Sequence, residues 1–404
     1  MTTNNHGTMC VVGGGIVGLA AALKASERGL FRRIIVLEKE AEVGQHQTSH
    51  NSGVLHCGLY YQPGSDKARL AVEGIRQMTA FCAAHDVPHE ICGKVVVAVT
   101  DDEVPRLREL EARGRSNGLT DLRWLDPAEL AEREPNVVAK LALLVPQEGI
   151  VDFPAVALKM RRLIEAAGHE IRTGTEFRGM HVTGSQRTVA TTRGEFTADF
   201  LLNCGGLHAD RVCQASGVAT PCRIIPFRGE YFRLTGDGVQ LVKHLVYPTP
   251  NPTLPFLGVH FTRMVHGGVE AGPNAVLAMK REGYRKTAFS PKDTFDSLCW
   301  PGFWRFLAKY PKVTLDEFKN SILRSAFLHN LQRLVPAVQA RHLGDSGFAG
   351  VRAQAMARDG SLLMDFMFER APGQLHVLNA PSPGATAALA IGNHIINQIQ
   401  EMCR

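Results

Sequence analysis

The stretch MCVVGGGIVGLAAALKASERGLFRRIIVLEKE, residues 9–40, decides the fold of this chain. A short apolar strand leads into a turn with Gly13, Gly15 and Gly18, an alanine- and leucine-rich helix follows, and a second strand ends at Glu38. This pattern predicts one strand–helix–strand unit. In such a unit the first glycine permits the tight turn, the second lets a pyrophosphate approach the backbone, and the third lets the helix pack against the strand. The helix N-terminus then offers free amide hydrogens and a partial positive charge to the phosphates.

Glu38 is placed to accept hydrogen bonds from both hydroxyls of an adenosine ribose, and Lys39 adjoins it. A carboxylate at this position disfavours a 2′-phosphate, so the unit predicts FAD or NAD and not NADP. A glycine turn of purely conformational origin is the weaker interpretation, because the strand, the helix and the acid are all present. The choice between FAD and NAD rests on the rest of the chain.

Length, composition and charge limit the classes of protein to which the chain can belong. At 404 residues the chain is expected to form two intertwined domains, and its 45% hydrophobic and 21% charged residues are typical of a globular protein. The net charge of +6 comes without a Lys/Arg block, which disfavours nucleic-acid binding but favours an anionic substrate or an acidic membrane surface. Nine cysteines without a CxxC motif predict reduced thiols in a cytoplasmic protein. No signal peptide is predicted, and no apolar run reaches the ~18 residues that span a bilayer, so any membrane contact would be peripheral.

A polar loop, residues 44–71, follows the first unit without a clear helical or strand period. It contains Ser49, His50, Asn51, Ser52 and His56, and such a loop is suited to wrapping the phosphates and ring of a cofactor. A solvated surface loop is the alternative. Its three histidines raise the question of zinc, but carboxylates and cysteines at ligand spacing are missing, so no metal site is predicted.

The middle of the chain predicts a second domain made of residues 85–145 and 216–340. Residues 226–234, 244–248, 256–264 and 269–280 are expected as strands of a mixed, largely antiparallel sheet. Alternation places Arg228 on one face of its strand and Tyr231 on the other, and His260 on a polar face of a later strand. Such a face could form the floor of a substrate cavity. The aromatic segment 293–310 is predicted to pack in the core, with contact to a membrane or a partner as the alternative.

Residues 1–84, 146–215 and 341–404 are expected to form the Rossmann-like first domain, giving an α/β protein overall. The apolar strand 200–203 ends before Gly205, where a ligand meets an open α/β sheet. Near the end of the chain, Gly384, Ala385 and Thr386 lie between a strand and a final helix expected from about Ala385. The N-terminus of that helix could stabilise negative charge on a cofactor ring.

Five motifs, in order along nearly the whole chain, resemble the D-amino-acid-oxidase-like FAD oxidoreductases, and within them the L-2-hydroxyglutarate dehydrogenase/oxidase family. They are GGGIVG, HQTSHNSGVLH, PFRGEYF, LGVHFTR and APSPGATAALAIG. The resemblance implies bound FAD and oxidation of L-2-hydroxyglutarate to 2-oxoglutarate. It implies that Gly13, Gly15, Gly18 and Glu38 hold the ADP half, and that Ser49, Asn51 and Ser52 lie near the phosphates and flavin. Noncovalent FAD is the expectation, and attachment through His46, His50 or His56 the alternative.

The same resemblance places Arg352 where relatives have an arginine that pairs with a substrate carboxylate, although Ala353 replaces the proline that follows it there. Oxidation of a 2-hydroxy acid needs a base for the hydroxyl proton, and a free imidazole titrates near 6.5. We therefore expect His56 as the base, with His260 second. Arg352 is expected to hold the C1 carboxylate and Arg228 the distal one, and Tyr231 to donate a hydrogen bond.

Several alternatives stay open. Another enzyme of this fold would oxidise an amino acid, a secondary amine or glycerol 3-phosphate. A NAD-dependent dehydrogenase would not need the polar loop or the C-terminal glycine turn, and a flavin-binding scaffold without activity would not need paired arginines and histidines. The electron acceptor is expected to be a quinone or oxygen, and a quinone would suit a cytoplasmic protein attached peripherally to the inner face of the cell membrane. The oligomeric state is left open.

Overall fold

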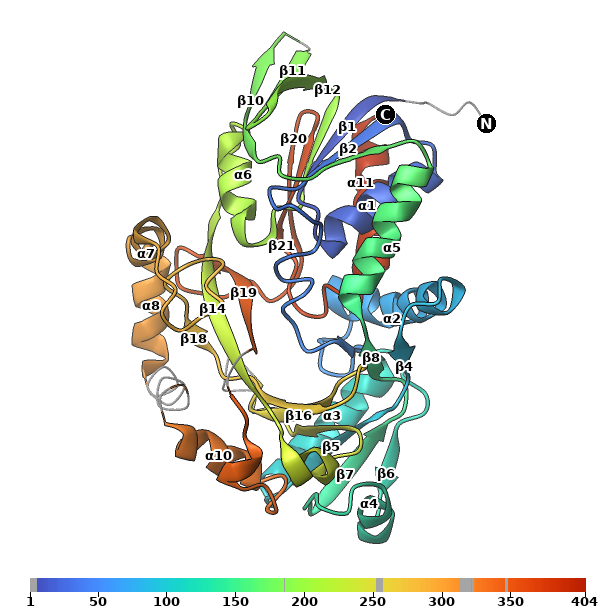
Figure 1. Ribbon diagram of the computed structural model, residues 1–404, viewed down its shortest axis with the longest axis vertical. Helices are drawn as coiled ribbons and strands as arrows, with labels where there is room; N and C mark the ends of the chain where they lie inside the picture. Colours follow the sequence, from blue (N-terminus) through green and yellow to red (C-terminus); the bar gives the residue numbers. More distant parts are fainter. Residues whose placement is uncertain (1–5, 185, 252–256, 312–320, 322, 346–347) are drawn as a thin grey trace.

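The computed structural model of the chain describes residues 6–184, 186–251, 257–311, 321, 323–345 and 348–404. Two large sheets lie in its upper and lower halves, and the long strand β14 (Cys222–Arg233) extends between them (Figure 1). The halves share a hydrophobic core, because one buried cluster contains Val11 and Val36 of the upper sheet together with Val96 and Leu143 of the lower one. A site between the sheets is therefore held from both sides.

The upper sheet has six strands in the order β20-β21-β13-β1-β2-β9, and all neighbouring pairs are parallel except β20 with β21. The strands are β1 (His6–Val12), β2 (Phe31–Leu37), β9 (Glu170–Arg172), β13 (Phe200–Asn203), β20 (Met367–Ala371) and β21 (Gln374–Asn379). Helices α1 (Ile16–Glu27), α5 (Phe153–Ala166) and α11 (Ala388–Met402) lie against this sheet (Figure 1). Its central strands are buried on both faces, as their continuous apolar runs predict. The predicted strand–helix–strand unit is confirmed as β1-α1-β2.

The lower sheet is mixed and largely antiparallel, as predicted, with the order β18-β14-β17-β16-β15-β5-β7-β6 and with β19 paired to β14. Only β15 and β5 run parallel among its described pairs. Its other strands are β5 (Lys94–Ala98), β6 (Arg123–Leu125), β7 (Leu141–Val145), β15 (Leu245–Pro248), β16 (His260–Arg263), β17 (Val269–Gly272), β18 (Val276–Leu277) and β19 (Phe348–Ala357). Residue 256, the first of the predicted strand 256–264, lies outside the residues that the structure describes.

Two smaller sheets accompany the large ones. A short sheet joins β3 (Val54–Leu55), β8 (Gly149–Val151) and β4 (His89–Glu90), and a hairpin sheet contains β10 (Phe177–Thr183), β11 (Gln186–Thr191) and β12 (Gly194–Ala198). Further α-helices are α2 (Asp66–Ala84), α3 (Glu103–Ser116), α4 (Pro127–Arg133), α6 (Ala209–Ala215), α7 (Pro291–Leu298), α8 (Pro301–Lys309) and α10 (Arg324–Gln332). Local signals set several ends: Ser65 caps α2, and Asp126 forms a capping box with Glu129 on α4.

The division into two domains stays a prediction, although the sheets show how its segments group. Strand β19 falls within the range 341–404 that was assigned to the first domain, yet it pairs with β14 along ten register positions, from Phe348 to Ala357. The C-terminal segment thus contributes β19 to the lower sheet and β20 and β21 to the upper one. In the part of the chain that the structure describes, none of the helices combines the length and apolar character needed to cross a membrane.

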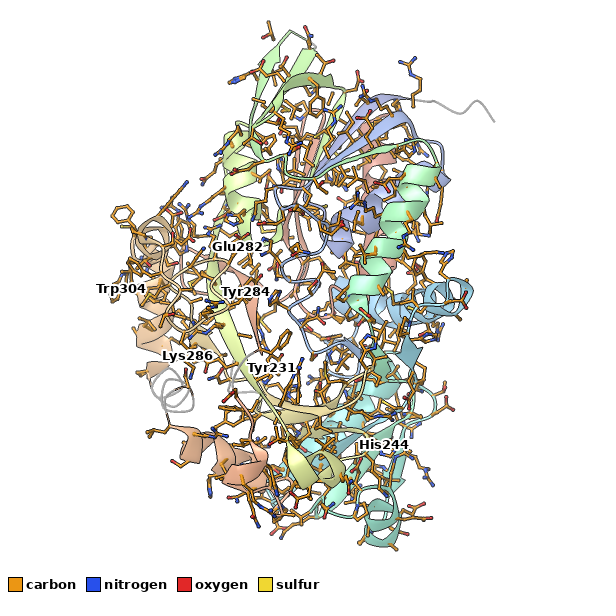
Figure 2. All side chains as sticks on the ribbon, viewed as in Figure 1. Tyr231, His244, Glu282, Tyr284, Lys286 and Trp304 are labelled. Atoms are coloured by element: carbon orange, nitrogen blue, oxygen red, sulfur yellow. The ribbon has the colours of Figure 1, made fainter. Side chains whose placement is uncertain are left out.

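The aromatic segment divides between core and surface. Trp300, Phe303 and Phe306 are buried in one cluster with Met356, which agrees with core packing. Phe295 and Trp304 are instead 69% and 57% exposed, and Figure 2 shows Trp304 at the outer edge of the molecule. This segment therefore both packs α7 and α8 against β14 and β19 and leaves an apolar surface.

Candidate active site

A cavity of about 1080 Å³ lies between the two sheets. Its lining includes the glycine turn after β1, the polar loop, the turn after β13, strands of the lower sheet, and the turn before α11. Of the predicted cofactor-binding residues, those that line it are Gly13, Gly15, Glu38, Lys39, His50, Asn51, Ser52, Gly205, Gly384, Ala385 and Thr386. Of the predicted catalytic residues, those that line it are His56, Tyr231, His260 and Arg352. Segments far apart in the sequence thus meet around one space.

The glycine turn depends on missing side chains. Gly13 has φ +111°, and a Cβ there would overlap the Cys204 carbonyl at the end of β13. Gly18 does not line the cavity; a Cβ on it would overlap the carbonyl of Gly13, so it serves the close packing of helix against strand. Gly15 lines the cavity with only Thr48 Oγ1 near its Cβ position, at 3.6 Å. The turn leaves backbone exposed to a ligand where side chains would block it.

Glu38 lies at the end of β2, beside this turn. Its Oε2 accepts a hydrogen bond from the amide of Gly14 at 3.0 Å, and its Oε1 accepts one from the amide of Glu40 at 2.9 Å. Burial raises the pKa of Glu38 from its ordinary value. A carboxylate has further acceptor positions on both oxygens, so it can still receive ribose hydroxyls.

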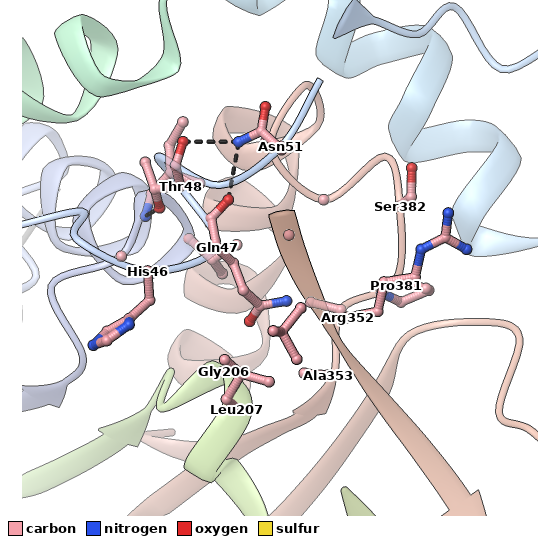
Figure 3. Close-up of a pocket in the computed structure, with 18 of the residues that line it drawn as sticks. His46, Gln47, Thr48, Asn51, Gly206, Leu207, Arg352, Ala353, Pro381 and Ser382 are labelled. Carbon is pink, nitrogen blue, oxygen red and sulfur yellow. Dashed lines mark hydrogen bonds between the residues drawn. The ribbon is translucent and has the colours of Figure 1, made fainter. Parts of the chain in front are cut away.

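The polar loop uses many of its groups to fold itself. Asn51 Nδ2 donates to the carbonyls of Gln47 and Thr48 at 2.9 and 2.8 Å, as the dashed lines in Figure 3 show. Ser49 Oγ donates to the Gly44 carbonyl at 2.5 Å, and Ser49 is not among the lining residues. The geometry therefore gives Ser49 a role in shaping the loop and does not place it at a ligand. Thr48, which was not singled out, accepts from the Ile16 amide at 3.0 Å and joins the loop to α1.

The C-terminal turn contacts the polar loop directly at the wall of the cavity. Thr386 Oγ1 donates to the Val54 carbonyl at 3.1 Å and accepts from the His56 amide at 3.2 Å. Helix α11 begins at Ala388, three residues later than expected, so Gly384 to Thr386 form the turn itself. Pro381 and Ser382, drawn in Figure 3, also line the cavity. The glycine turn, the carboxylate and this helix N-terminus together fit an extended dinucleotide with a ring system at the α11 end.

Two histidines lie at the lower-sheet side of the cavity. His56 Nδ1 is 3.3 Å from Oε2 of Glu148, and its side chain is 17% exposed. His260 Nδ1 bonds the Gly258 carbonyl at 3.1 Å, and its ring stacks on Tyr247 with centroids 3.9 Å apart. Burial lowers the pKa of His260 to about 3, which makes it a weak base. Of the two candidates, the geometry favours His56.

The cations around the cavity differ from the prediction. Arg228 is buried, bonds Glu230 Oε1 at 2.9 Å and the Arg285 carbonyl at 3.1 Å, and is not among the lining residues. Arg352 and Lys67 do line the cavity. Burial, together with the positive charge of Arg352, lowers the pKa of Lys67 to about 8 although Asp365 opposes this. Two neighbouring cations facing one space can bind an anion.

The sequence prediction also missed Lys94 and Glu148. Lys94 lies in β5 with 0% exposure, and its Nζ is 2.6 Å from Oε2 of Glu148, which is also 0% exposed. A lysine at the start of the apolar run KVVVAV could have indicated a buried charge, since an unpaired lysine is rarely buried. Nothing in the local sequence identifies Glu148 as its partner, because the two residues are 54 positions apart.

Comparison with known proteins identifies the family of the chain. Residues 8–398 match the family model of the FAD dependent oxidoreductases. The chain is 45% identical over 386 residues to L-2-hydroxyglutarate dehydrogenase of Indibacter alkaliphilus, and the match covers 95% of this chain and 96% of that one. It is 43% identical over 393 residues to L-2-hydroxyglutarate dehydrogenase of Escherichia coli strain K12, and that match covers 97% of this chain and 93% of the relative. Its fold resembles the FAD-bound L-alpha-glycerophosphate oxidase of Mycoplasma pneumoniae, with a TM-score of 0.78, 21% identity and coverage of 97% and 95%. The chain belongs to the FAD-dependent oxidoreductases and, within them, to the L-2-hydroxyglutarate dehydrogenase family.

Proposed function

We propose that this protein oxidises L-2-hydroxyglutarate to 2-oxoglutarate. The observation that carries the proposal is that a histidine with a carboxylate behind it, His56, and two cations, Arg352 and Lys67, line the same cavity as the glycine turn. A 2-hydroxy diacid needs those three groups, one for the hydroxyl proton and two for its carboxylates. The names of the relatives support the same substrate.

FAD, when bound, supplies a hydride acceptor at the flavin N5. His56 takes the proton of the C2 hydroxyl as the hydride leaves C2, so that the C–O bond becomes the C=O of the 2-oxo acid. Arg352 holds the C1 carboxylate, and Tyr231, whose pKa burial raises to about 12, stays protonated and can donate a hydrogen bond. Lys67 holds the distal carboxylate. These roles give His56, Arg352, Tyr231 and Lys67 one contact each with the substrate.

The related substrates of the fold fit these residues less well. An amino acid or a secondary amine would bring a further positive charge into a cavity that Arg352 and Lys67 already make cationic. The deciding experiment mixes the purified protein anaerobically with L- and D-2-hydroxyglutarate, glycerol 3-phosphate, sarcosine and L-amino acids, and follows the flavin absorbance. We expect bleaching with the L-hydroxy diacid first. Faster bleaching by an amine or by the D-enantiomer would overturn the proposed substrate.

Noncovalent FAD is part of the proposal. His50, one of the candidates for covalent attachment, has its Nδ1 on the His46 carbonyl at 3.1 Å and its ring stacked on Tyr284 with centroids 3.7 Å apart. Those contacts occupy the ring in the folded chain. Acid precipitation should release all of the flavin into the supernatant, and a yellow pellet would show a covalent bond.

A quinone at a membrane surface is the proposed electron acceptor, with oxygen as the alternative. The support is the apolar surface of α7 and α8, where Phe295 and Trp304 are exposed beside Lys292, a combination suited to an anionic bilayer. We expect the protein to sediment with vesicles containing anionic lipid, and the variant Phe295→Ser/Trp304→Ser to stay in the supernatant while its flavin is still reduced by substrate. Full turnover in a salt-washed soluble fraction without stimulation by quinone would count against this acceptor.

A further inference from the structure

His56 is held from behind by two residues from separate elements. Strand β3 pairs antiparallel with β8, with Val54 opposite Ile150 and Leu55 opposite Gly149. Continuing this register brings His56 beside Glu148, at 3.3 Å between Nδ1 and Oε2. The Gly93 amide donates to the Glu148 carbonyl at 2.8 Å, which places Lys94 on the other side of the same carboxylate, at 2.6 Å.

The ion pair between Lys94 and Glu148 is completely buried. The ammonium of Lys94 lies 4.4 Å from the ring centre of Tyr60 and 4.9 Å from that of Tyr247, so aromatic faces surround a charge that water would otherwise solvate. A buried ion pair contributes little stability compared with apolar side chains of similar volume. A role at the site explains its presence better than a contribution to folding.

The Glu148 carboxylate is saturated with donors. Besides Lys94 and His56, its Oε1 accepts from the amide of Cys57 at 3.2 Å. Although burial opposes ionisation, Lys94 and His56 hold the pKa of Glu148 well below its ordinary value. An ionised carboxylate only accepts hydrogen bonds, so Nδ1 of His56 must carry a hydrogen, and Nε2 is the ring nitrogen left to receive a proton.

We propose that Glu148 and Lys94 form a fixed support for His56, in which Glu148 sets the tautomer that leaves Nε2 free to accept the substrate proton and Lys94 cancels the charge of Glu148. Without Lys94, an uncompensated buried carboxylate would hold His56 as the imidazolium, which cannot act as a base. With Lys94, the charge of Glu148 is compensated, and Glu148 stabilises the imidazolium that forms when His56 takes the substrate proton. Glu148 and Lys94 are positioning residues, because they act through His56. The catalytic part of this inference rests on the proposed function; the protonation of His56 does not.

Five of the other titratable groups near His56 stay uncharged at neutral pH. Around His56 or Glu148 they are Cys57, Tyr60, Tyr61, Tyr247 and His260. Burial raises the pKa of the cysteine and of each tyrosine, and lowers that of the histidine. Arg352 and Lys67 are the cations that line the same cavity, and Lys67 loses its charge as pH rises through about 8. A pH response measured at His56 between about pH 5 and 7 therefore reports on His56 and on the two charges behind it.

The test compares Glu148→Gln and Lys94→Met with the wild-type holoenzyme in two measurements. The first is the rate of flavin reduction by L-2-hydroxyglutarate against pH, with substrate concentration varied. The second uses no substrate: it follows modification of His56 by diethyl pyrocarbonate, which attacks neutral imidazole, by peptide mass spectrometry against pH. His181, which is exposed on β10, is the internal control.

We expect Glu148→Gln to keep its FAD and its half-saturating substrate concentration within a few-fold, and to be reduced about 10²-fold more slowly, because the tautomer is no longer fixed. In Lys94→Met, both the acid limb of the reduction rate and the labelling curve of His56 should move to higher pH, while labelling of His181 does not change. The double variant Glu148→Gln/Lys94→Met should lose that displacement, since it removes both charges together.

Unchanged pH curves in Lys94→Met, or a wild-type reduction rate in Glu148→Gln, would overturn the inference. If Glu148→Gln failed to fold with FAD, the double variant would decide, because it leaves no unpaired buried charge: a wild-type rate in it contradicts the role of Glu148, and a slow rate supports it. If L-2-hydroxyglutarate did not reduce the wild-type flavin while the labelling curve still moved in Lys94→Met, the proposed substrate would fail and the support of His56 would stand.

Discussion

The two ends of the cavity are built in opposite ways. The glycine turn, residues 13–18, is made of backbone, comes from one continuous stretch, and works because side chains are missing. The charged wall, which we define as His56, Lys67, Lys94, Glu148 and Arg352, is made of side chains brought together from distant parts of the chain. The turn should therefore be sensitive to any added Cβ, whereas the wall should be sensitive to the charge and donor pattern of each side chain. Variants can separate the two kinds of dependence.

The largest effect is expected in the glycine turn. Gly13→Val adds a branched side chain at φ +111°, where even a Cβ overlaps the Cys204 carbonyl, so we expect purified protein without the flavin band at about 450 nm. Gly29→Ala is the matched control: it also has positive φ, at +57°, but nothing lies within 4 Å of its Cβ position. The control should keep FAD and lose only about 1 kcal/mol of stability. Normal FAD content in Gly13→Val would contradict the backbone account of this end.

The next effect lies in the wall and should leave the turn intact. His56→Ala should retain its FAD, because only its backbone amide contacts the C-terminal turn, but its flavin should be reduced about 10³-fold more slowly through loss of the base. His260→Asn is the comparison, and we expect less than about a 10-fold effect there, since His260 is a weak base. Stopped-flow reduction under anaerobic conditions measures both. An unchanged rate in His56→Ala, or the larger loss in His260→Asn, would reverse the assignment of the base.

This contrast also explains what the sequence could predict. The unit β1-α1-β2 was predictable because all of its determinants, the glycines, the apolar periods and Glu38, lie within about thirty residues and act through local geometry. The mixed lower sheet was predictable from alternating strands, and the resemblance supplied Arg352. The family and its cofactor followed from motifs of this kind.

The rest depends on pairing that no local pattern encodes. Glu148 supports His56 only because β3 pairs with β8, and Lys94 joins them only because β5 lies alongside. Arg228 was expected at the substrate because arginine on a half-buried strand can face a cavity. In the structure, Arg228 instead pairs with Glu230, which lies two residues further along the same face of β14. The ion pair gives each of the two charged groups a partner. Ser49 was expected to contact the cofactor through its hydroxyl. In the structure that hydroxyl donates to the Gly44 carbonyl and so stabilises the turn of the loop.

A smaller effect is expected from the cation at the distal carboxylate. Lys67→Met should raise the half-saturating concentration of L-2-hydroxyglutarate by about 10–100-fold at pH 7, while weak reduction by L-lactate, which lacks that carboxylate, should not change. In the wild type, the ammonium is present below its pKa of about 8 and is lost above it, so affinity for the diacid should fall as pH rises through about 8. In Lys67→Met, the affinity for the diacid should not fall over this pH range. A wild-type affinity in Lys67→Met, or an equal loss with L-lactate, would remove Lys67 from the substrate site.

The smallest effect concerns an ion pair near the glycine turn, between the loop that follows β18 and the residues that follow β2. Glu282, beside Tyr284 in the centre of Figure 2, has its Oε1 2.8 Å from Lys39 Nζ and 3.1 Å from His208 Nε2. Although burial opposes ionisation, hydrogen bonds from His208 and Lys39 lower the pKa of Glu282 to about 2. A carboxyl whose pKa is lower in the folded chain stabilises it above the unfolded value of 4.5, and this stabilisation is lost as pH falls from there toward 2.

Glu282→Gln should therefore lower the free energy of unfolding of the holoenzyme by about 1–2 kcal/mol at pH 7, a value reduced for solvent screening because the side chain is 18% exposed. In urea titrations between pH 7 and pH 3, the difference from the wild type should stay constant down to about pH 5 and then shrink. Lys24→Gln, which removes the exposed pair with Glu27, is the control and should change stability by less than about 0.5 kcal/mol. A difference that did not depend on pH would mean that Glu282 acts by packing and not through its charge.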